Sequence, residues 1–254
     1  MPAAQMTPLP PDRGGTETSA ERYLHLEEGA SPTRAAATER LRAWADRAVN
    51  LGLALFLMIL TLPIWIVVAL TIKLTSRGSV MYSQVRVGRD ERNLRSAAAS
   101  DPRRKVDFGG RPFKIYKFRT MVEDAEHKSG PVWATRGDPR ITRVGRVLRE
   151  FRLDELPQLL NVIKGEMNLV GPRPERPTFV VELRREIPGY PERHRVKPGL
   201  TGLAQVNLQY DSCVDTVRAK LEYDLEYVRQ RSLFRDLKII LKTIPVVLFR
   251  RGGW

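Results

Sequence analysis

The chain has 254 residues, enough for one sizeable domain with appendages, and a formal net charge of +14. Its single cysteine, Cys213, excludes an intramolecular disulfide and a cysteine-based metal cluster, and its three histidines lack metal-ligand spacing. The positive charge favours anionic partners but does not choose among phosphates, nucleic acid and acidic lipid headgroups.

The N-terminal part of the chain differs from the rest in charge and composition. Residues 1–46 hold five Arg and seven Asp or Glu, so the basic excess lies entirely further along the chain. Residues 1–38 are rich in Pro, Ala, Thr, Ser, Gly and Glu without a sustained apolar period, which predicts a disordered tail. The apolar run begins too late in the chain for a secretory signal.

Residues 39–74 are predicted to form a membrane-interface helix followed by a membrane anchor. The first part combines arginines with Leu41 and Trp44, a composition suited to the lipid headgroup layer. Between Arg47 and Lys73 lie 25 residues without a formal charge. As a straight helix this run is long enough to cross a bilayer core of about 30 Å.

Two topologies are open for this anchor. A single spanning helix is the simpler one, and many spanning helices tolerate a proline. However, Pro63 near the middle of the run predicts a bend, and basic residues flank both ends of the run. Because positive charge marks the cytoplasmic side, the flanks favour a re-entrant helix–break–helix that enters and leaves by one face.

Residues 75–254 are predicted to form a small α+β domain that is mainly helical. Two strand-like segments, 79–87 and 111–121, predict a short β-hairpin with a mobile loop at about 90–110. Apolar residues at helical spacing predict helices near 141–149, after 154, over 214–228 and over 233–248. The last of these is amphipathic and rich in Lys and Arg, so it suits the membrane interface at least as well as ordinary packing in the core.

Asp154 and Glu155 are candidate catalytic residues at a predicted helix N-terminus. Adjacent residues on a helix point in different directions, so the two carboxylates are expected to have different roles. Acidic residues in a first helical turn can also simply complement the helix dipole. Basic residues are nevertheless dense nearby in the sequence, and a cationic pocket around a carboxylate pair suits a phosphate substrate with a divalent cation.

Three motifs carry a resemblance to a known family. They are KFRTM at 117–121, LDELPQLLNVIKGEMNLVGPRP at 153–174 and KPGLTGLAQVN at 197–207. In this order they resemble the bacterial sugar transferases, specifically the monotopic polyprenol-phosphate phosphoglycosyltransferases. The resemblance extends from about Ala45 to about Leu248.

The resemblance implies a mechanism and a set of site residues. Asp154 would attack the β-phosphate of a UDP-sugar, giving a covalent phosphosugar–enzyme and UMP, and Glu155 would help to hold Mg²⁺. The basic residues near the substrate phosphates would be Lys117, Arg119, Arg149 and Arg173. The family's anchor is a re-entrant helix bent at a proline, a position that Pro63 matches.

The resemblance also implies partners and a location. The sugar-1-phosphate would pass to a membrane polyprenol phosphate at the cytoplasmic face of the bacterial inner membrane, initiating exopolysaccharide, O-antigen or glycoconjugate assembly. Inner-membrane lipid and downstream glycosyltransferases are further expected partners, and nucleic acid is not. Leu203 and Leu208 replace an aromatic residue and a glycine of many relatives, which affects the expected sugar pocket.

Two other interpretations are weaker. A membrane-tethered nucleic-acid-binding or scaffold protein would explain the basic charge, but it predicts a basic recognition helix or interleaved aromatics, and the sequence has neither. A one-step transferase, in which Asp154 acts as a base or a metal ligand, would use the same residues. A trapped covalent intermediate would distinguish the two mechanisms.

Overall fold

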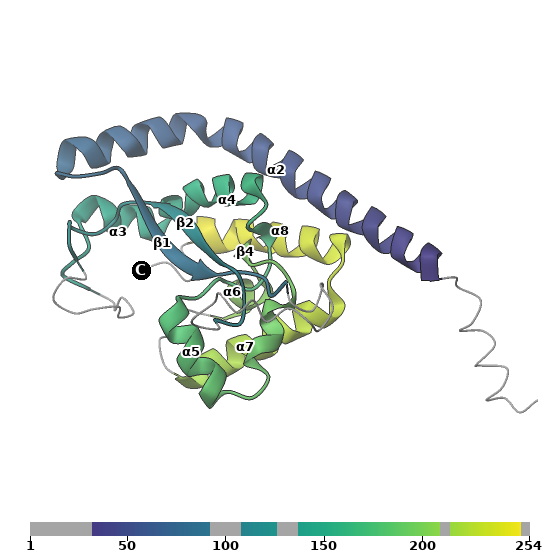
Figure 1. The fold of residues 1–254 in the computed structure, drawn as a ribbon. Coiled ribbons are helices and arrows are strands. Elements are labelled where there is room, and N and C mark those ends of the chain that lie inside the picture. Colours follow the sequence, from purple (N-terminus) through teal and green to yellow (C-terminus); the bar gives the residue numbers. More distant parts are fainter. Residues whose placement is uncertain (1–31, 92–107, 126–136, 209–213, 250–254) are drawn as a thin grey trace, which may run out of the picture. The chain divides into compact units, whose positions relative to one another are not determined.

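A computed structural model describes residues 32–91, 108–125, 137–208 and 214–249 (Figure 1). Residues 1–45 and 46–254 form two separate compact units. The described part of the first unit is the beginning of helix α2 (Pro32–Thr75). Most of the predicted tail, most of the predicted 90–110 loop and Cys213 lie outside the described residues.

The second unit contains two small sheets. Strands β1 (Met81–Val87) and β2 (Pro112–Phe118) are antiparallel, with Met81 opposite Phe118, which confirms the predicted strand pair. Strands β3 (Asn168–Val170) and β4 (Gly199–Thr201) are parallel and were not predicted, because three residues are too few to show a period.

Helices make up most of the described residues, which confirms the mainly helical α+β class. In chain order after α2 they are α3 (Arg143–Glu150), the 3₁₀ helix η2 (Leu153–Gln158), α4 (Leu159–Lys164), α5 (Pro177–Glu186), the 3₁₀ helix η3 (Tyr190–Arg195), α6 (Leu203–Asn207), α7 (Val214–Gln230) and α8 (Leu233–Leu248). Of these, α5, η3 and α6 were not predicted.

Helix α2 is continuous through Pro63, so the predicted break does not occur. Proline removes the N–H that would bond the carbonyl of Ile59. The ribbon of α2 is curved in Figure 1, and a curved helix accommodates such a loss without being interrupted. Packing also restrains both halves of the apolar run, because Ala54 on one side of Pro63 and Val68 and Ile72 on the other are all buried.

Within the second unit, both ends of the apolar run are hydrogen-bonded to segments that come later in the chain. Near the start, Arg47 Nη1 donates to the carbonyl of Val162 at 2.6 Å, and the Asn50 side chain accepts from the backbone N–H of Leu169 at 2.7 Å. At the far end, Arg119 Nη2 donates to the carbonyl of Ser76 at 3.0 Å. The segment from residue 46 to residue 76 therefore lies along the surface of the unit.

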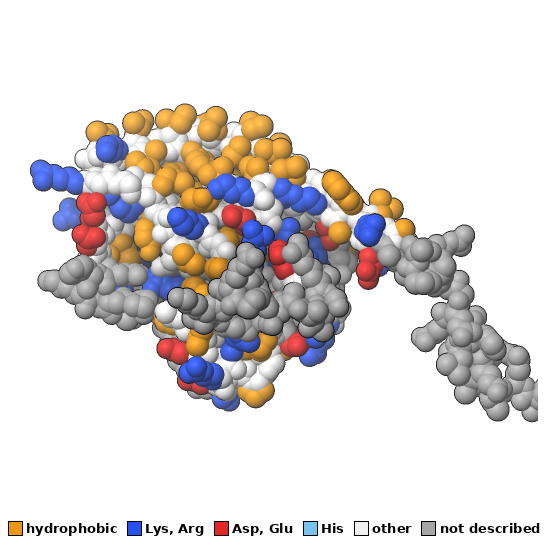
Figure 2. Space-filling model, viewed as in Figure 1, with side chains coloured by type: hydrophobic (Ala, Val, Ile, Leu, Met, Phe, Trp, Pro, Cys, Tyr) orange, Lys and Arg blue, Asp and Glu red, His pale blue; other side chains and the backbone are white. Residues whose placement is uncertain are grey.

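The outer face of this segment is strongly apolar. Phe56, Ile59 and Val67 are each more than half exposed, and Figure 2 shows hydrophobic side chains gathered along α2. By length and composition α2 is long and apolar enough to cross a membrane. Helix α8 adds a second exposed apolar face, which includes Phe234 and Leu241.

Candidate active site

Asp154 and Glu155 lie in the first turn of η2, as the sequence predicts. The turn begins at Arg152, whose backbone is left-handed with φ of 55°, a conformation that L residues other than glycine adopt infrequently. Both carboxylates are nearly buried, with Asp154 6% and Glu155 7% exposed. Burying two adjacent carboxylates is unfavourable unless cations or hydrogen bonds compensate them.

Two cations balance the negative charge of Glu155. Lys117 Nζ lies 2.7 Å from Glu155 Oε1, and Arg173 binds both oxygens, with Nη2 2.5 Å from Oε1 and Nη1 3.3 Å from Oε2. Burial raises the pKa of Glu155, but Arg173 and Lys117 together outweigh burial and hold the pKa well below its usual range. Glu155 is therefore ionised at neutral pH.

The negative charge of Asp154 is balanced much less by its surroundings. Among the described residues, Lys117 Nζ at 3.8 Å from Oδ2 is its only charge contact within 4 Å, and Asp154 has no hydrogen-bond partner there. Burial raises the pKa of the Asp154 carboxyl above its usual range; Lys117 counteracts this, whereas the Glu155 charge adds to it. The pair thus has one fixed, ionised carboxylate and one unbonded carboxylate, as expected when two acidic groups have different roles.

Lys117 reaches the pair because of its place on β2. Residues 113, 115 and 117 share one face of this strand, so Lys117 follows the buried Phe113 and Ile115. Asn161, fully buried in α4, accepts from the backbone N–H of Tyr116 at 3.1 Å and donates to the carbonyl of Lys114 at 2.7 Å. This side chain fixes β2 against the η2–α4 segment.

Arg173 belongs to a turn whose backbone is extensively bonded. The carbonyl of Pro172 accepts from Gly199 N–H at 3.0 Å, and that of Pro174 accepts from Arg86 at 3.1 Å. The β3–β4 pairing brings the two motifs together, and it requires glycine because a Cβ on Gly199 would lie 2.0 Å from the nitrogen of Gly171. The turn therefore holds Arg173 in position toward Glu155.

The remaining carbonyl of the turn is held by a buried ion pair that sequence reasoning missed. Arg193 Nη2 donates to the carbonyl of Arg173 at 2.8 Å and lies 2.7 Å from Asp224 Oδ2, while Nη1 donates to Tyr190 Oη at 2.8 Å. Arg193 and Asp224 are both buried. In a chain with 43 Lys and Arg, nothing in the local sequence marks one arginine as internal.

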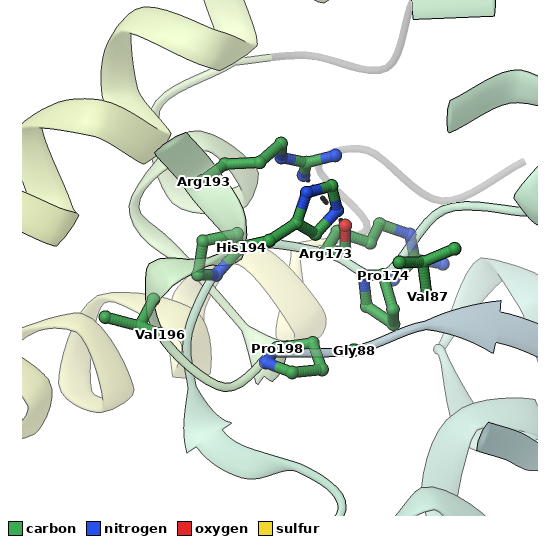
Figure 3. Close-up of a pocket in the computed structure, with 9 residues that line it drawn as sticks. Val87, Gly88, Arg173, Pro174, Arg193, His194, Val196 and Pro198 are labelled. Carbon is green, nitrogen blue, oxygen red and sulfur yellow. Dashed lines mark hydrogen bonds between the residues drawn. The ribbon is translucent and has the colours of Figure 1, made fainter. Parts of the chain in front are cut away.

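A small pocket lies behind this turn (Figure 3). Its lining comes from the end of β1, the 172–174 turn and the segment from 193 to 198. His194 lines it, and burial, followed by the charges of Arg193 and Arg184, lowers the pKa of His194 to about 3, so this imidazole is neutral.

The structure brings only some of the predicted basic residues to the carboxylates. Lys117 and Arg173 contact Glu155 directly. Arg149 lies close enough to lower the pKa of Asp154, while its Nε donates to Thr120 Oγ1 at 2.9 Å. Arg119 is not brought into the cluster, because its guanidinium is buried against Ser76 at the end of α2.

The carboxylate pair fits a magnesium ion that is held jointly with substrate. Among the described residues, no group of three or more His, Cys, Asp or Glu is placed to hold a metal. Mg²⁺ in phosphoryl-transfer sites usually needs only one or two carboxylates, because phosphate oxygens and waters complete its octahedron. Glu155 Oε2, whose one contact to Arg173 is 3.3 Å long, is the oxygen of Glu155 best placed to become a ligand.

Comparison with known proteins gives a consistent family. The bacterial sugar transferase family model matches residues 41–98 and 102–250. A UDP-N-acetylgalactosamine-undecaprenyl-phosphate N-acetylgalactosaminephosphotransferase of Aeromonas hydrophila is 42% identical over 83% of this chain and 45% of its own length. A UDP-glucose:undecaprenyl-phosphate glucose-1-phosphate transferase of Caulobacter vibrioides is 40% identical, over 80% of this chain and 69% of its own length.

Another relative matches along nearly its whole length. The exopolysaccharide production protein ExoY of Sinorhizobium fredii is 35% identical over 88% of this chain and 94% of its own length. By contrast, the chain spans less than half the length of the Aeromonas relative. Since the family model covers well over half of the chain, the chain belongs to the bacterial sugar transferase family, as its motifs predict.

Proposed function

We propose that this protein transfers a sugar-1-phosphate from a UDP-sugar to a membrane polyprenol phosphate through a covalent intermediate on Asp154. The observation that carries the proposal is the contrast within the buried pair. Glu155 is held by Lys117 and Arg173, whereas Asp154 has no hydrogen-bond partner among the described residues. A nucleophile must have a free oxygen, and Asp154 is the member of the pair that has one.

The proposed reaction consists of two successive displacements at phosphorus. In the first, an Asp154 oxygen bonds to the β-phosphorus of the UDP-sugar, the bond from that phosphorus to the bridging oxygen breaks, and UMP leaves. In the second, a phosphate oxygen of the polyprenol phosphate attacks the same phosphorus and Asp154 is released. Lys117, Arg149 and Arg173 reduce the charge repulsion that otherwise keeps a carboxylate from a pyrophosphate.

Magnesium is the proposed cofactor, with Glu155 as its protein ligand. When bound, Mg²⁺ would withdraw charge from the phosphate oxygens. Lys117 and Arg173 keep Glu155 ionised, which is the state that a metal ligand requires. Hydrogen bonds fix the turn that carries Arg173, and the Arg173 guanidinium in turn holds Glu155 in one orientation.

We further propose that the protein is monotopic, with its catalytic unit on the cytoplasmic face of the bacterial inner membrane. Arg47 and Ser76 flank the apolar run, and both are bonded to the same unit. If the run crossed the bilayer, one of these bonds would have to form on the far side, and that would draw part of the polar unit through hydrocarbon at high cost. A helix that lies in the interface keeps both bonds.

The proposed substrates and pathway follow from the names of relatives. The names of the Aeromonas and Caulobacter proteins specify a UDP-sugar as donor, undecaprenyl phosphate as acceptor and a sugar phosphate as the transferred group. The name of the Sinorhizobium relative refers to exopolysaccharide production. We therefore propose a role in starting such a glycan, with downstream glycosyltransferases as partners and no nucleic acid.

The covalent step is tested with Asp154→Asn. Incubation with a panel of UDP-sugars should release UMP and give a phosphosugar adduct by intact-protein mass spectrometry for the wild type only. Because the raised pKa of Asp154 means that its ionised form is disfavoured in the fold, the neutral variant should be at least as thermally stable at neutral pH. UMP release by a well-folded Asn variant would instead support a one-step mechanism.

The topology is tested by thiol labelling of intact spheroplasts. Single cysteines replace Ser19, outside the described residues, or Ser232, the N-cap of α8, in a Cys213→Ser background. With a membrane-impermeant reagent, neither site should label until the membrane is opened. Labelling at the Ser19 position alone in sealed cells would show a spanning helix and end the monotopic proposal.

A further inference from the structure

Four basic side chains from distant segments converge away from the carboxylate pair. They are Arg47, Arg89, Lys197 and Arg231, and together they are called the basic basin. The backbone N–H of Asn168, which follows the end of α4 that Arg47 binds, donates to the carbonyl of Pro198 at 2.8 Å, so Lys197 lies beside this end of α4. The charges of Arg47, Arg89 and Arg231 accordingly lower the pKa of Lys197, and that of Arg231 lowers the pKa of Arg89. Backbone contacts fix the arrangement, since Arg47 is bonded to the end of α4 and Arg89 Nε donates to the carbonyl of Arg195 at 3.0 Å.

The acidic groups around the basin do not balance it. Asp46 is paired with Arg231 at 2.6 Å, and Glu91 also lies 3.7 Å from the exposed Arg111. Lys197 has no hydrogen bond or ion pair within the described ranges, although its side chain is only partly exposed. Burial lowers the pKa of Lys197, and Arg47, Arg89 and Arg231 lower it further. Crowding four cations around two carboxylates is unfavourable unless a further anion joins them.

The basin lies where two apolar helices begin. Arg47 immediately precedes the uncharged run of α2, and Arg231 precedes α8 with its exposed Leu233 and Phe234. Both helices contribute to one core, through Ala54 and Ile239. The basin is thus at the depth of lipid headgroups, a placement that rests on the proposed membrane location.

The basin is separate from the carboxylate pair. Arg47 binds the carbonyl of Val162 at one end of the η2–α4 segment, and Asp154 is at the other. A rise of 1.5 Å per residue over this segment corresponds to about 12 Å, more for its 3₁₀ part. A phosphate in the basin is therefore too far from Asp154 to react there, which argues against the acceptor phosphate as the occupant.

We propose that the basic basin binds the phosphate of an anionic bilayer phospholipid, as a second phosphate site besides the catalytic one. Guanidinium and ammonium groups bind phosphate through charge-assisted hydrogen bonds, and basic pockets beside membrane helices are known to hold lipid headgroups. The four basic groups outnumber the carboxylates of Asp46 and Glu91 by two, and this excess of positive charge attracts the single negative charge of a phosphodiester.

Lipid binding is measured on the purified full-length protein by native mass spectrometry. The protein is titrated with dioleoyl phosphatidylglycerol, and with dioleoyl phosphatidylcholine for comparison. Lys197→Gln should weaken the tightest phosphatidylglycerol site about tenfold or more, the usual effect of removing one charge-assisted bond. Lys238→Gln removes the same charge from the exposed surface of α8 and should change this affinity less than twofold.

Competition identifies the source of the phosphate. Inorganic phosphate and polyprenol phosphate should each displace phosphatidylglycerol only at concentrations well above that of the lipid. The proposal is overturned if inorganic phosphate or polyprenol phosphate displaces phosphatidylglycerol at a concentration equal to or below that of the lipid. It is also overturned if Lys197→Gln and Lys238→Gln weaken phosphatidylglycerol binding equally. None of these measurements uses a UDP-sugar, so failure of lipid binding and failure of the transferase reaction are distinguishable.

Discussion

Replacing Arg193 by Met leaves the buried Asp224 carboxylate without its partner. Breaking a buried ion pair from one side costs about 3–5 kcal/mol. At 2–4 °C per kcal/mol for a domain of about 150–250 residues, the melting temperature should fall by roughly 6–20 °C. Burial raises the pKa of Asp224, so the orphaned carboxyl can protonate, and the loss should lie toward the lower end of this range.

The double variant Arg193→Met/Asp224→Leu separates folding from positioning. With both charges gone, a well-packed apolar pair should bring the melting temperature close to that of the wild type. The carbonyl of Arg173 still lacks its donor, so the turn that aims Arg173 at Glu155 is loosened. Small misplacements in active sites are costly, and the kcat for UMP release should stay about 10–100-fold low.

The assay pairs intrinsic tryptophan fluorescence during heating with UMP release, for the wild type and both variants in the same detergent. The expected pattern is low stability with low activity in the single variant, and restored stability with low activity in the double variant. Recovery of activity together with stability would refute the positioning role and leave the ion pair as a purely structural element.

Three further predictions concern the dyad and the anchor. Glu155→Gln should raise the Mg²⁺ concentration required for UMP release while leaving some turnover at saturating Mg²⁺, and an unchanged Mg²⁺ dependence would exclude Glu155 as the ligand. Because the pKa of Asp154 is raised, this carboxylate should become protonated, and activity should fall, at a pH above the usual Asp pKa of about 4. Full activity down to pH 4 would contradict the raised pKa. Pro63→Ala should leave the thiol-labelling pattern unchanged, since packing and the bonds of Arg47 and Arg119 restrain α2; a labelled N-terminus would show that the proline sets the topology.

The sequence predicts the acidic pair and its motif partners because the relevant signals are local. Asp154 and Glu155 are adjacent, and apolar residues at helical spacing follow them directly. Lys117 and Arg173 lie within recognisable motifs, and the structure brings both to Glu155. The two carboxylates are bonded differently, and their separate catalytic roles stay a prediction.

Residues that act through long-range contacts could not be predicted in this way. Asn161 bonds the backbone of β2, which is 45 or more residues away, and Arg193 meets Asp224 across 31 residues. Neither contact leaves a period or a motif in the sequence. Arg119 shows a further limit of local signals, because its place in KFRTM does not reveal that its side chain bonds Ser76, and its role near the phosphates stays a prediction.

The anchor shows how a sound local argument can predict the wrong local structure. Pro63 and the basic flanks together favoured a broken hairpin, yet α2 is continuous. A hairpin is one way to bring both ends of an apolar run to the same face, and a helix lying along the interface is another. The bonds of Arg47 and Arg119 to a single unit favour the second arrangement, in which the outward face of α2 contacts lipid while its inner face packs near the strand that carries Lys117.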